Sequence, residues 1–247
     1  MLNTELELII NNKLNNNKIN DFAPNGLQIE GRNEVQCILT GVSICQELIN
    51  FAIEKYFDAI IVHHGIFWNN EEMVIRGIKK TRIKSILDNN INVYAWHLPL
   101  DINNKLGNNI KLAKKLNINL ISIIENILLY GNFTNAISGE ELYLKLKHIF
   151  NKNILYFNKN APKKIKNIVL CTGSGQKFIN LMYKYNVDAF ITGEVSEQTF
   201  HAAKEIGIHF YAAGHHATEI YGIKSLGKWL SEKYFFNVTF LNVYNPA

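Results

Sequence analysis

Short, nearly uninterrupted apolar segments alternate along this chain with longer segments in which apolar residues recur every three or four positions. The short segments are typical of strands buried on both faces of a parallel sheet, and the longer ones are typical of helices. Predicted strands cover 36–40, 57–62, 91–96, 166–171, 187–192 and 208–213. Predicted helices cover 44–56, 75–89, 105–116, 177–186, 196–206 and 218–233. This alternation predicts an α/β fold with mainly parallel sheets flanked by helices.

Both ends of the chain carry patterns of their own. Thr4 and Glu7 have the spacing of a capping box, and the apolar positions Leu6 and Ile10 continue an amphipathic helix from there. Such a start is unlike a signal peptide. Near the other end, the alternating segment 235–243 predicts an edge or hairpin strand.

The two halves of the chain resemble each other. Segments 38–65 and 168–194 both run through a strand, a glycine-containing turn and a helix. In each half an Asp-Ala pair, beginning at Asp58 or Asp188, then opens the next strand. A third strand containing Tyr-Ala follows in both halves. Three matches in register predict an internal pseudo-repeat of two similar α/β domains.

The expected domains cover 1–126 and 127–247, with the exact boundary open within 125–165. A chain of 247 residues has room for two domains of ordinary size. Its hydrophobic residues make up 47% and its charged residues 19%, which excludes a disordered chain and predicts a globular one.

The net charge of +5 does not by itself predict an anionic partner. It comes from lysines, since the only arginines are Arg32, Arg76 and Arg82. Arginine is the residue best suited to bidentate contacts with phosphates and bases, so a nucleic-acid partner is not expected. The lysine clusters are expected on solvated faces.

Cysteine usage and hydropathy limit the compartment. The three cysteines form neither a CxxC pair nor an even framework, which argues against a disulfide scaffold or a zinc ribbon and favours a reducing cytoplasm. No apolar segment reaches the roughly 18 residues that a membrane span requires. We therefore expect a cytoplasmic protein without a membrane partner.

Histidines and carboxylates gather where three of the predicted strands end. The residues concerned are His63, His64, Asp101, His215 and Glu219. Ligands of open α/β sheets bind beyond the carboxyl ends of the strands, so polar residues there carry more weight than elsewhere. We favour a metal site over accidental enrichment at all three ends.

The spacing of these residues suits such a site. His63 and His64 are adjacent and can reach one centre only where their strand ends, and Gly65 permits a turn there. His215 and Glu219 share a helix face if a helix begins near 215. Nitrogen and oxygen ligands without thiolate suit Zn, Fe, Mn or Co, and single out none of them.

The number of candidate ligands points to a pair of ions. Five ligands exceed the three that a catalytic zinc ion usually takes from the protein. Two divalent ions that share a bridging carboxylate would use all five. Because such pairs activate water, hydrolysis is the natural reaction class.

Other polar residues near the strand ends leave several roles open. His97 could be the partner of a ligand, a general base or an ordinary loop residue. Glu194 and His201 are candidates for lining the same cavity, although helix-start chemistry explains their segment as well. Isolated histidines such as His148 and His209 are more often core or surface residues than ligands, so neither is included.

Five segments together resemble one family, the YbgI-type dinuclear metal proteins known as GTP cyclohydrolase type 2 homologues. They are 21–28 (DFAPNGLQ), 62–65 (VHHG), 96–101 (WHLPLD), 192–194 (TGE) and 214–219 (GHHATE). The likeness runs nearly end to end. It implies that the five candidate residues are the metal ligands, with Glu219 bridging two ions. It also implies two similar α/β domains in a toroidal homohexamer.

The resemblance and the residues together lead to three hypotheses. The first is a dinuclear metal-dependent hydrolase that opens the ring of a purine nucleotide through a metal-bound hydroxide, with His97 or Glu194 moving protons. The alternative is a non-catalytic metal-binding hexameric ring that serves as a scaffold. A nucleic-acid-binding ring is the weakest, given the few arginines.

Overall fold

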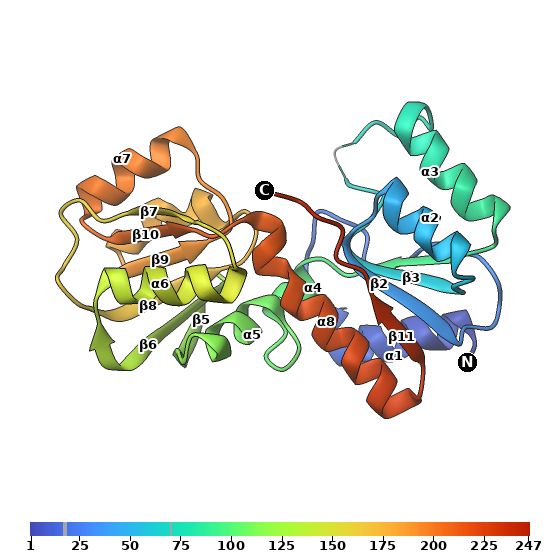
Figure 1. The fold of residues 1–247 in the computed structure, drawn as a ribbon, viewed down its shortest axis with the longest axis horizontal. Helices are drawn as coiled ribbons and strands as arrows, with labels where there is room; N and C mark the ends of the chain where they lie inside the picture. Colours follow the sequence, from blue (N-terminus) through green and yellow to red (C-terminus); the bar gives the residue numbers. More distant parts are fainter. Residues whose placement is uncertain (17–18, 70) are drawn as a thin grey trace. The chain divides into compact units, whose positions relative to one another are not determined.

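The chain divides into two compact units in the computed structural model, which describes residues 1–16, 19–69 and 71–247. Unit 1 comprises Met1–Gly107 and Gly222–Tyr244, and unit 2 comprises Asn108–Tyr221 and Asn245–Ala247. Each unit is a sheet with helices packed on it (Figure 1). This confirms the predicted α/β class.

The sheet of unit 1 is mainly parallel, with strand order β1-β4-β3-β2-β11 over the described residues. Its strands are β1 (Gly26–Ile29), β2 (Cys37–Ser43), β3 (Ala59–His64), β4 (Asn92–Ala95) and β11 (Asn237–Phe240). β11, β2, β3 and β4 run parallel, and β1 pairs antiparallel with β4. β4 is buried along its whole length and β3 along nearly all of it, as expected of strands covered on both faces.

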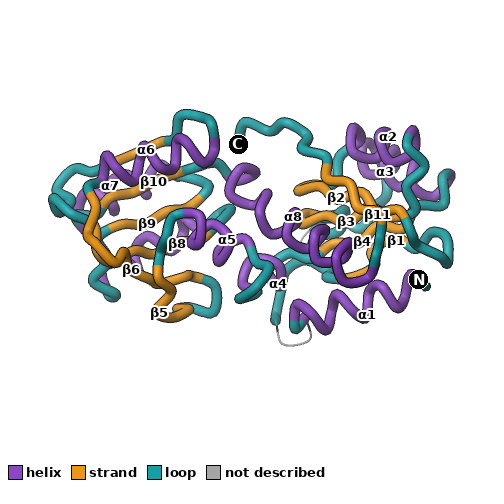
Figure 2. The backbone as a smooth tube through the Cα atoms, turned by 60° about the horizontal axis from the view of Figure 1, so that its bottom comes forward, coloured by secondary structure: helices purple, strands orange, loops and turns teal. Residues whose placement is uncertain are grey.

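Helices lie on both faces of this sheet. α2 (Gln46–Glu54) and α3 (Gly77–Asp88) cover one face, and α1 (Asn3–Leu14) covers the other (Figure 2). α8 (His215–Tyr234) begins in unit 2 and ends in unit 1. The short helix α4 (Leu98–Ile102) directly follows β4 and has Pro99 in its first turn, where proline needs no hydrogen-bond partner for its nitrogen.

The sheet of unit 2 has the order β5-β6-β8-β9-β10-β7 over the described residues. Its strands are β5 (Asn119–Ile124), β6 (Leu128–Ile137), β7 (Leu155–Phe157), β8 (Ile165–Cys171), β9 (Ala189–Thr192) and β10 (His209–Ala212). β8, β9 and β10 form the predicted parallel centre. The flanking strands β5, β6 and β7 pair antiparallel and were not predicted, so this sheet is mixed.

Two apolar cores lie on opposite faces of the second sheet. On one face α5 (Asn108–Lys115) and α6 (Gly139–Phe150) pack against Ile168 and Ile191. On the other, the 3-10 helix η2 (Gly175–Tyr183) and α7 (Glu197–Ile206) pack against Val169 and Phe190. Successive strand residues thus enter different cores, which explains why these segments are apolar without interruption.

The internal repeat has a hydrogen-bonding basis. Asp58 Oδ2 accepts the backbone N–H groups of Gln36 and Cys37, at 2.9 and 2.8 Å. Asp188 Oδ2 accepts the N–H groups of residues 166 and 167, both at 2.8 Å. In each unit the aspartate that opens the second parallel strand therefore ties down the start of the first. The Asp-Ala echo in the sequence marks this contact.

Two tyrosines add a further equivalent contact, each to the start of a helix in its own unit. Tyr94 Oη donates to the carbonyl of Asn3 at the start of α1, and Tyr211 Oη donates to the carbonyl of Gly139 at the start of α6, both at 2.9 Å. Both tyrosines are fully buried. The two α/β units are thus similar in their contacts as well as in their element order.

Several details differ from the sequence prediction. The N-cap of α1 is Leu2, whose side chain cannot accept a hydrogen bond, so the predicted capping box at Thr4 does not form; Glu5 Oε2 accepts the N–H of Leu2. Glu7 Oε1 instead accepts the N–H of Leu27 in β1, at 2.9 Å, and so ties α1 to this strand. The segment around Asn237 does form an edge strand, as predicted.

The two units do not follow the expected division at residue 127. β5 and β6 hydrogen-bond into the second sheet through β8, so residues 108–126 belong to unit 2. β11 pairs with β2, so residues 222–244 belong to unit 1. Strand pairing, which joins residues far apart in the chain, sets this division.

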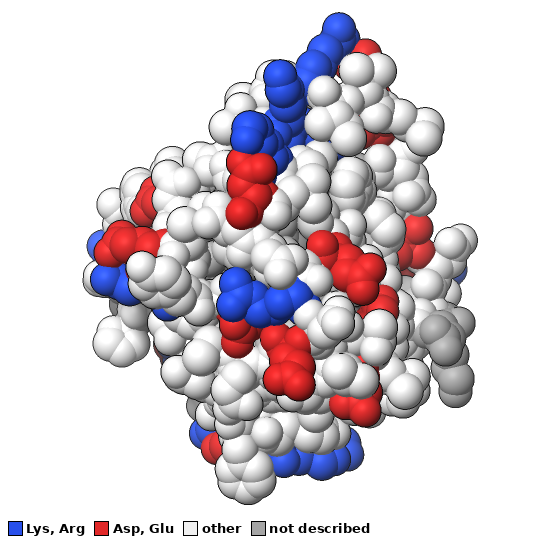
Figure 3. Space-filling view, turned by 90° about the vertical axis from the view of Figure 1, so that its right-hand side faces the viewer, with Lys and Arg blue, Asp and Glu red and all other residues white. Residues whose placement is uncertain are grey.

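One face of the molecule shows basic and acidic side chains interspersed, without a continuous basic stripe across it (Figure 3). Such a mixture is typical of a solvated surface. Among the described residues, no helix combines the length and the apolar character that crossing a membrane requires.

Candidate metal centre

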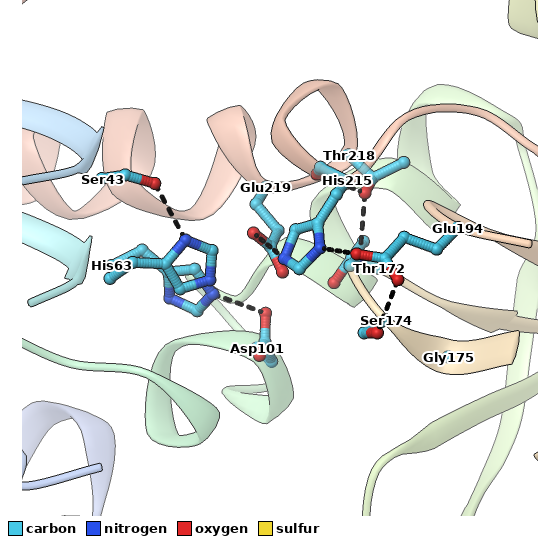
Figure 4. A network of polar contacts seen from close by, with 12 residues as sticks. Ser43, His63, Asp101, Thr172, Ser174, Gly175, Glu194, His215, Thr218 and Glu219 are labelled. Atoms are coloured by element: carbon cyan, nitrogen blue, oxygen red, sulfur yellow. Dashed lines mark hydrogen bonds and ion pairs between the residues drawn. The ribbon is translucent and has the colours of Figure 1, made fainter. Parts of the chain in front are cut away.

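His63, at the end of β3, has a ring whose proton is fixed by its surroundings. Its side chain is fully buried, and its Nδ1 lies 3.0 Å from the carbonyl oxygen of Trp96. A carbonyl oxygen can only accept a hydrogen bond, so Nδ1 carries the proton. Nε2 of the neutral ring is then unprotonated and acts as an acceptor. Nε2 faces Asp101 Oδ1 at 3.5 Å (Figure 4). A cation between these two buried acceptors, either a second ring proton or a metal ion, would stabilise their approach.

His64 and His97 complete a histidine cluster in unit 1. One ring nitrogen from each of His63, His64 and His97 lies within 4.8 Å of the others. The rings of His63 and His64 have centroids only 4.5 Å apart, since β3 ends at His64 and the backbone no longer directs the two side chains to opposite faces. Nδ1 of His64 is 2.9 Å from Ser43 Oγ.

Asp21 holds His97 in one orientation. Asp21 Oδ1 accepts from His97 Nδ1 at 2.9 Å, and Asp21 Oδ2 accepts the N–H of Leu98 at 2.8 Å. Burial raises the pKa of Asp21, but hydrogen bonds from His97 and Asn25 outweigh it and hold the pKa below its ordinary value. The ionised carboxylate keeps the proton of His97 on Nδ1 and leaves Nε2 as the acceptor. Sequence reasoning missed Asp21, although it lies in the segment 21–28.

His215 and Glu219 meet in unit 2 as their spacing predicted, because α8 begins at His215. His215 Nε2 lies 3.1 Å from Glu219 Oε2, and His215 Nδ1 lies 2.5 Å from Glu194 Oε1 (Figure 4). Burial lowers the pKa of His215, but the carboxylates of Glu219 and Glu194 raise it to about 9. A metal ion at Nε2 would replace the second ring proton. The arrangement repeats that of His63 and Asp101 in unit 1.

Glu194 follows β9, and both of its carboxylate oxygens accept hydrogen bonds. Besides His215, it accepts hydrogen bonds from Ser174 Oγ and Gln176 Nε2, both at 2.9 Å. Burial raises the pKa of Glu194, but the hydrogen bonds from His215, Ser174 and Gln176 lower it below its ordinary value. The geometry makes Glu194 the group that orients the His215 ring.

The turn after β8 packs against Glu219. Gly173 has a φ of +64°, and a Cβ at this position would lie 2.0 Å from Glu219 Oε1. Its N–H donates to Thr218 Oγ1 at 3.0 Å. Only glycine fits here, on both steric and conformational grounds. The turn therefore supports the carboxylate.

The remaining candidate histidines lie elsewhere. His201 is exposed, and its Nε2 lies 3.3 Å from Glu197 Oε1, one helical turn away. His209 is buried, with Nε2 donating to the carbonyl of residue 162 and Nδ1 accepting from Tyr156 Oη. His148 is exposed on α6. None of these three histidines belongs to the groups of described residues that could hold a metal ion.

The donor atoms fit a borderline divalent cation. Among the described residues the candidate ligand atoms are histidine nitrogens and carboxylate oxygens, and no cysteine sulfur is among them. Burial of such groups is costly unless a cation compensates them. The residues present could therefore hold metal ions.

Comparisons with known proteins agree with the architecture. The profile of the Duf34/NIF3 (NGG1p interacting factor 3) family matches residues 1–246. Proteins named GTP cyclohydrolase 1 type 2 homolog are 50% identical in Haemophilus influenzae and 49% identical in Escherichia coli, over the full length of both chains. A solved structure described as protein ybgI, of unknown function, is 49% identical with a TM-score of 0.98, and TTHA1606 from Thermus thermophilus is 29% identical with a TM-score of 0.91. Both cover this chain and their own completely.

Proposed function

This chain belongs to the Duf34/NIF3 family, and on that premise we propose that it is a metal-dependent hydrolase acting on a purine nucleotide. One observation carries the proposal: in each unit a histidine has Nδ1 held by an acceptor and turns Nε2 toward a carboxylate. The pairs are His63 with Asp101 and His215 with Glu219. The name shared by the relatives suggests the substrate class.

The proposed ligands of two divalent ions are His63, His64, Asp101, His215 and Glu219, with Glu219 bridging. Their support is the fixed tautomer of His63, the orientation of His215 by Glu194, and the absence of thiolate from the described clusters. When bound, a pair of divalent ions acidifies a water molecule and stabilises negative charge on substrate oxygens.

His97 is the residue we assign to proton transfer. Hydrolytic opening of a purine ring moves a proton from the attacking water to a ring nitrogen. His97 has an acceptor at Nε2, and the ionised Asp21 beside Nδ1 stabilises the ring once it is doubly protonated. Glu194 is the weaker candidate, because its oxygens already serve His215, Ser174 and Gln176.

Elemental analysis tests the ligand set first. Protein purified without added metal or chelator should carry about two ions per chain, and the double variant Asp101→Ala, His215→Ala should lose them. No metal in the native protein, and none after reconstitution with Zn, Mn, Fe or Co, would refute the ligand set.

Turnover then tests the hydrolase. Metal-loaded protein should hydrolyse GTP, and His97→Ala should keep its metal while losing turnover. His148→Ala, which changes an exposed histidine on α6, is the matched control and should behave as native. Bound metal without turnover would instead support the non-catalytic metal-binding homohexamer, whose stoichiometry light scattering measures.

A further inference from the structure

Two aromatic side chains stand next to the histidine cluster of unit 1. Phe22 directly follows Asp21, and Trp68 lies in the loop after β3. Their rings stack with centroids 5.9 Å apart and an angle of 28° between the planes. Phe22 is 48% exposed, although it lies beside the buried His97.

The two rings have a defined orientation relative to the histidines. The plane of His97 is inclined by 75° to Phe22 and by 78° to Trp68, with centroid distances of 4.9 and 5.2 Å. The Trp68 ring also lies 5.7 Å from that of His64. The rings of Phe22 and Trp68, which we call the aromatic wall, are therefore both steeply inclined to the ring of His97.

Hydrogen bonds hold this wall in place. Asp21 Oδ1 accepts the N–H of Ala23, which fixes the backbone on both sides of Phe22. The N–H of Asn69 donates to the carbonyl of Phe22 at 2.9 Å, so the loop that carries Trp68 is tied to Phe22. Both aromatic side chains are thus placed by the backbone that also positions His97.

We propose that Phe22 and Trp68 form a stacking subsite for a flat heteroaromatic ring, the base of a purine nucleotide. A ring that stacks on Phe22 lies parallel to it and, like Phe22, is steeply inclined to the ring of His97. Stacking on an aromatic face needs no particular hydrogen-bond pattern and contributes substantially to the affinity for each base. The inference rests on the proposed function and adds which part of the substrate the wall recognises.

A purely structural role explains the wall less well. An aromatic cluster that only closes a core buries its members, as Tyr94 and Trp96 are buried in the same unit. Phe22 instead keeps nearly half of its surface in solvent beside groups that can transfer protons. Aromatic side chains beside a few polar groups are the usual lining of a ligand site.

Binding of GMP to metal-free protein, measured by calorimetry beside ribose 5-phosphate, tests the subsite without turnover. Native protein should bind GMP more tightly than ribose 5-phosphate. Phe22→Leu, which keeps an apolar side chain of similar size, should weaken GMP binding on the order of 10-fold or more and leave ribose 5-phosphate unchanged. Phe22→Tyr should restore GMP binding. Tyr56→Asn removes an aromatic ring that is 84% exposed in the same unit and should have no effect.

The outcomes separate the subsite from the hydrolase. Equal GMP affinity in native protein and Phe22→Leu overturns the subsite, and so does native protein that binds GMP no better than ribose 5-phosphate. If native protein and Phe22→Leu both hydrolyse GTP with the same KM, the subsite is overturned and the hydrolase is not. GMP binding that depends on Phe22, in a protein that hydrolyses no nucleotide, would keep the subsite and refute the hydrolase.

Discussion

Replacing Asp21 with asparagine should move the proton of His97 from one ring nitrogen to the other. The Asp21 side chain is 2% exposed, and its two oxygens accept from Ala23 N, His97 Nδ1, Asn25 Nδ2 and Leu98 N. Asparagine offers only one acceptor oxygen. If that oxygen still accepts the hydrogen bonds from Asn25 Nδ2 and Leu98 N, the amide NH₂ group faces His97 Nδ1. Nδ1 must then accept a hydrogen bond instead of donating one. The ring proton consequently moves to Nε2.

The size of both effects follows from these contacts. The variant loses at least one hydrogen bond to a charged group, which should lower the free energy of unfolding by about 1.5–3 kcal/mol. A proton on Nε2 removes the acceptor that we assign to proton transfer, so kcat should fall roughly 10²- to 10⁴-fold. Metal content should not change, because neither Asp21 nor His97 belongs to the proposed ligand set.

Three measurements check this prediction: the His97 tautomer by long-range ¹H–¹⁵N NMR, the free energy of unfolding in urea, and kcat with GTP. Asp58→Asn is the matched control, since Asp58 accepts two backbone N–H groups and pairs with Arg32 but contacts no histidine. The Asp58→Asn variant should lose a comparable free energy of unfolding and keep both the native tautomer of His97 and the native kcat. An Asp21→Asn protein with the proton still on Nδ1 and with native kcat would refute the assignment.

Three further predictions concern single side chains. Glu219→Gln removes the carboxylate charge proposed to bridge the ions, so elemental analysis should find at most one ion per chain, and retention of both would refute the bridge. Glu194→Gln should weaken metal affinity roughly 10- to 100-fold in chelator competition, because the His215 ring loses its charged partner; unchanged affinity would contradict that role. Burial lowers the pKa of His209 below 6.5, so the unfolded chain binds more protons and stability should fall as the pH drops from 7 through 6.5. In His209→Gln, urea unfolding at about pH 7 and about pH 5.5 should show a smaller fall, and an equal fall would count against this assignment.

The sequence by itself determined the parallel centres of both sheets. A strand buried on both faces has to be apolar at successive positions, as in 57–62 and 187–192, and this signal is local. The aspartates that open β3 and β9 were readable because the repeat placed the same contact in both halves. The candidate ligands were also readable, since chain direction alone decides which end of a parallel strand is the carboxyl end.

The flanking strands depended on tertiary structure. β5 is exposed along almost all of its length, and its apolar residues therefore show no alternation that would predict a strand. β11 was expected at an edge, but its pairing with β2 joins residues that are 200 positions apart, such as Asn237 and Cys37. No local pattern encodes a partner at such a distance.

The protonation pattern of the site was likewise decided only by the fold. Asp21 and His97 are separated by 76 positions in the sequence. The local sequence around either residue therefore does not predict that they form a pair. His63 depends in the same way on the carbonyl of Trp96 across the sheet. A residue type determines which ligand atoms are available, whereas the partner that the folded chain brings to Nδ1 determines whether Nε2 can accept a proton or a metal ion.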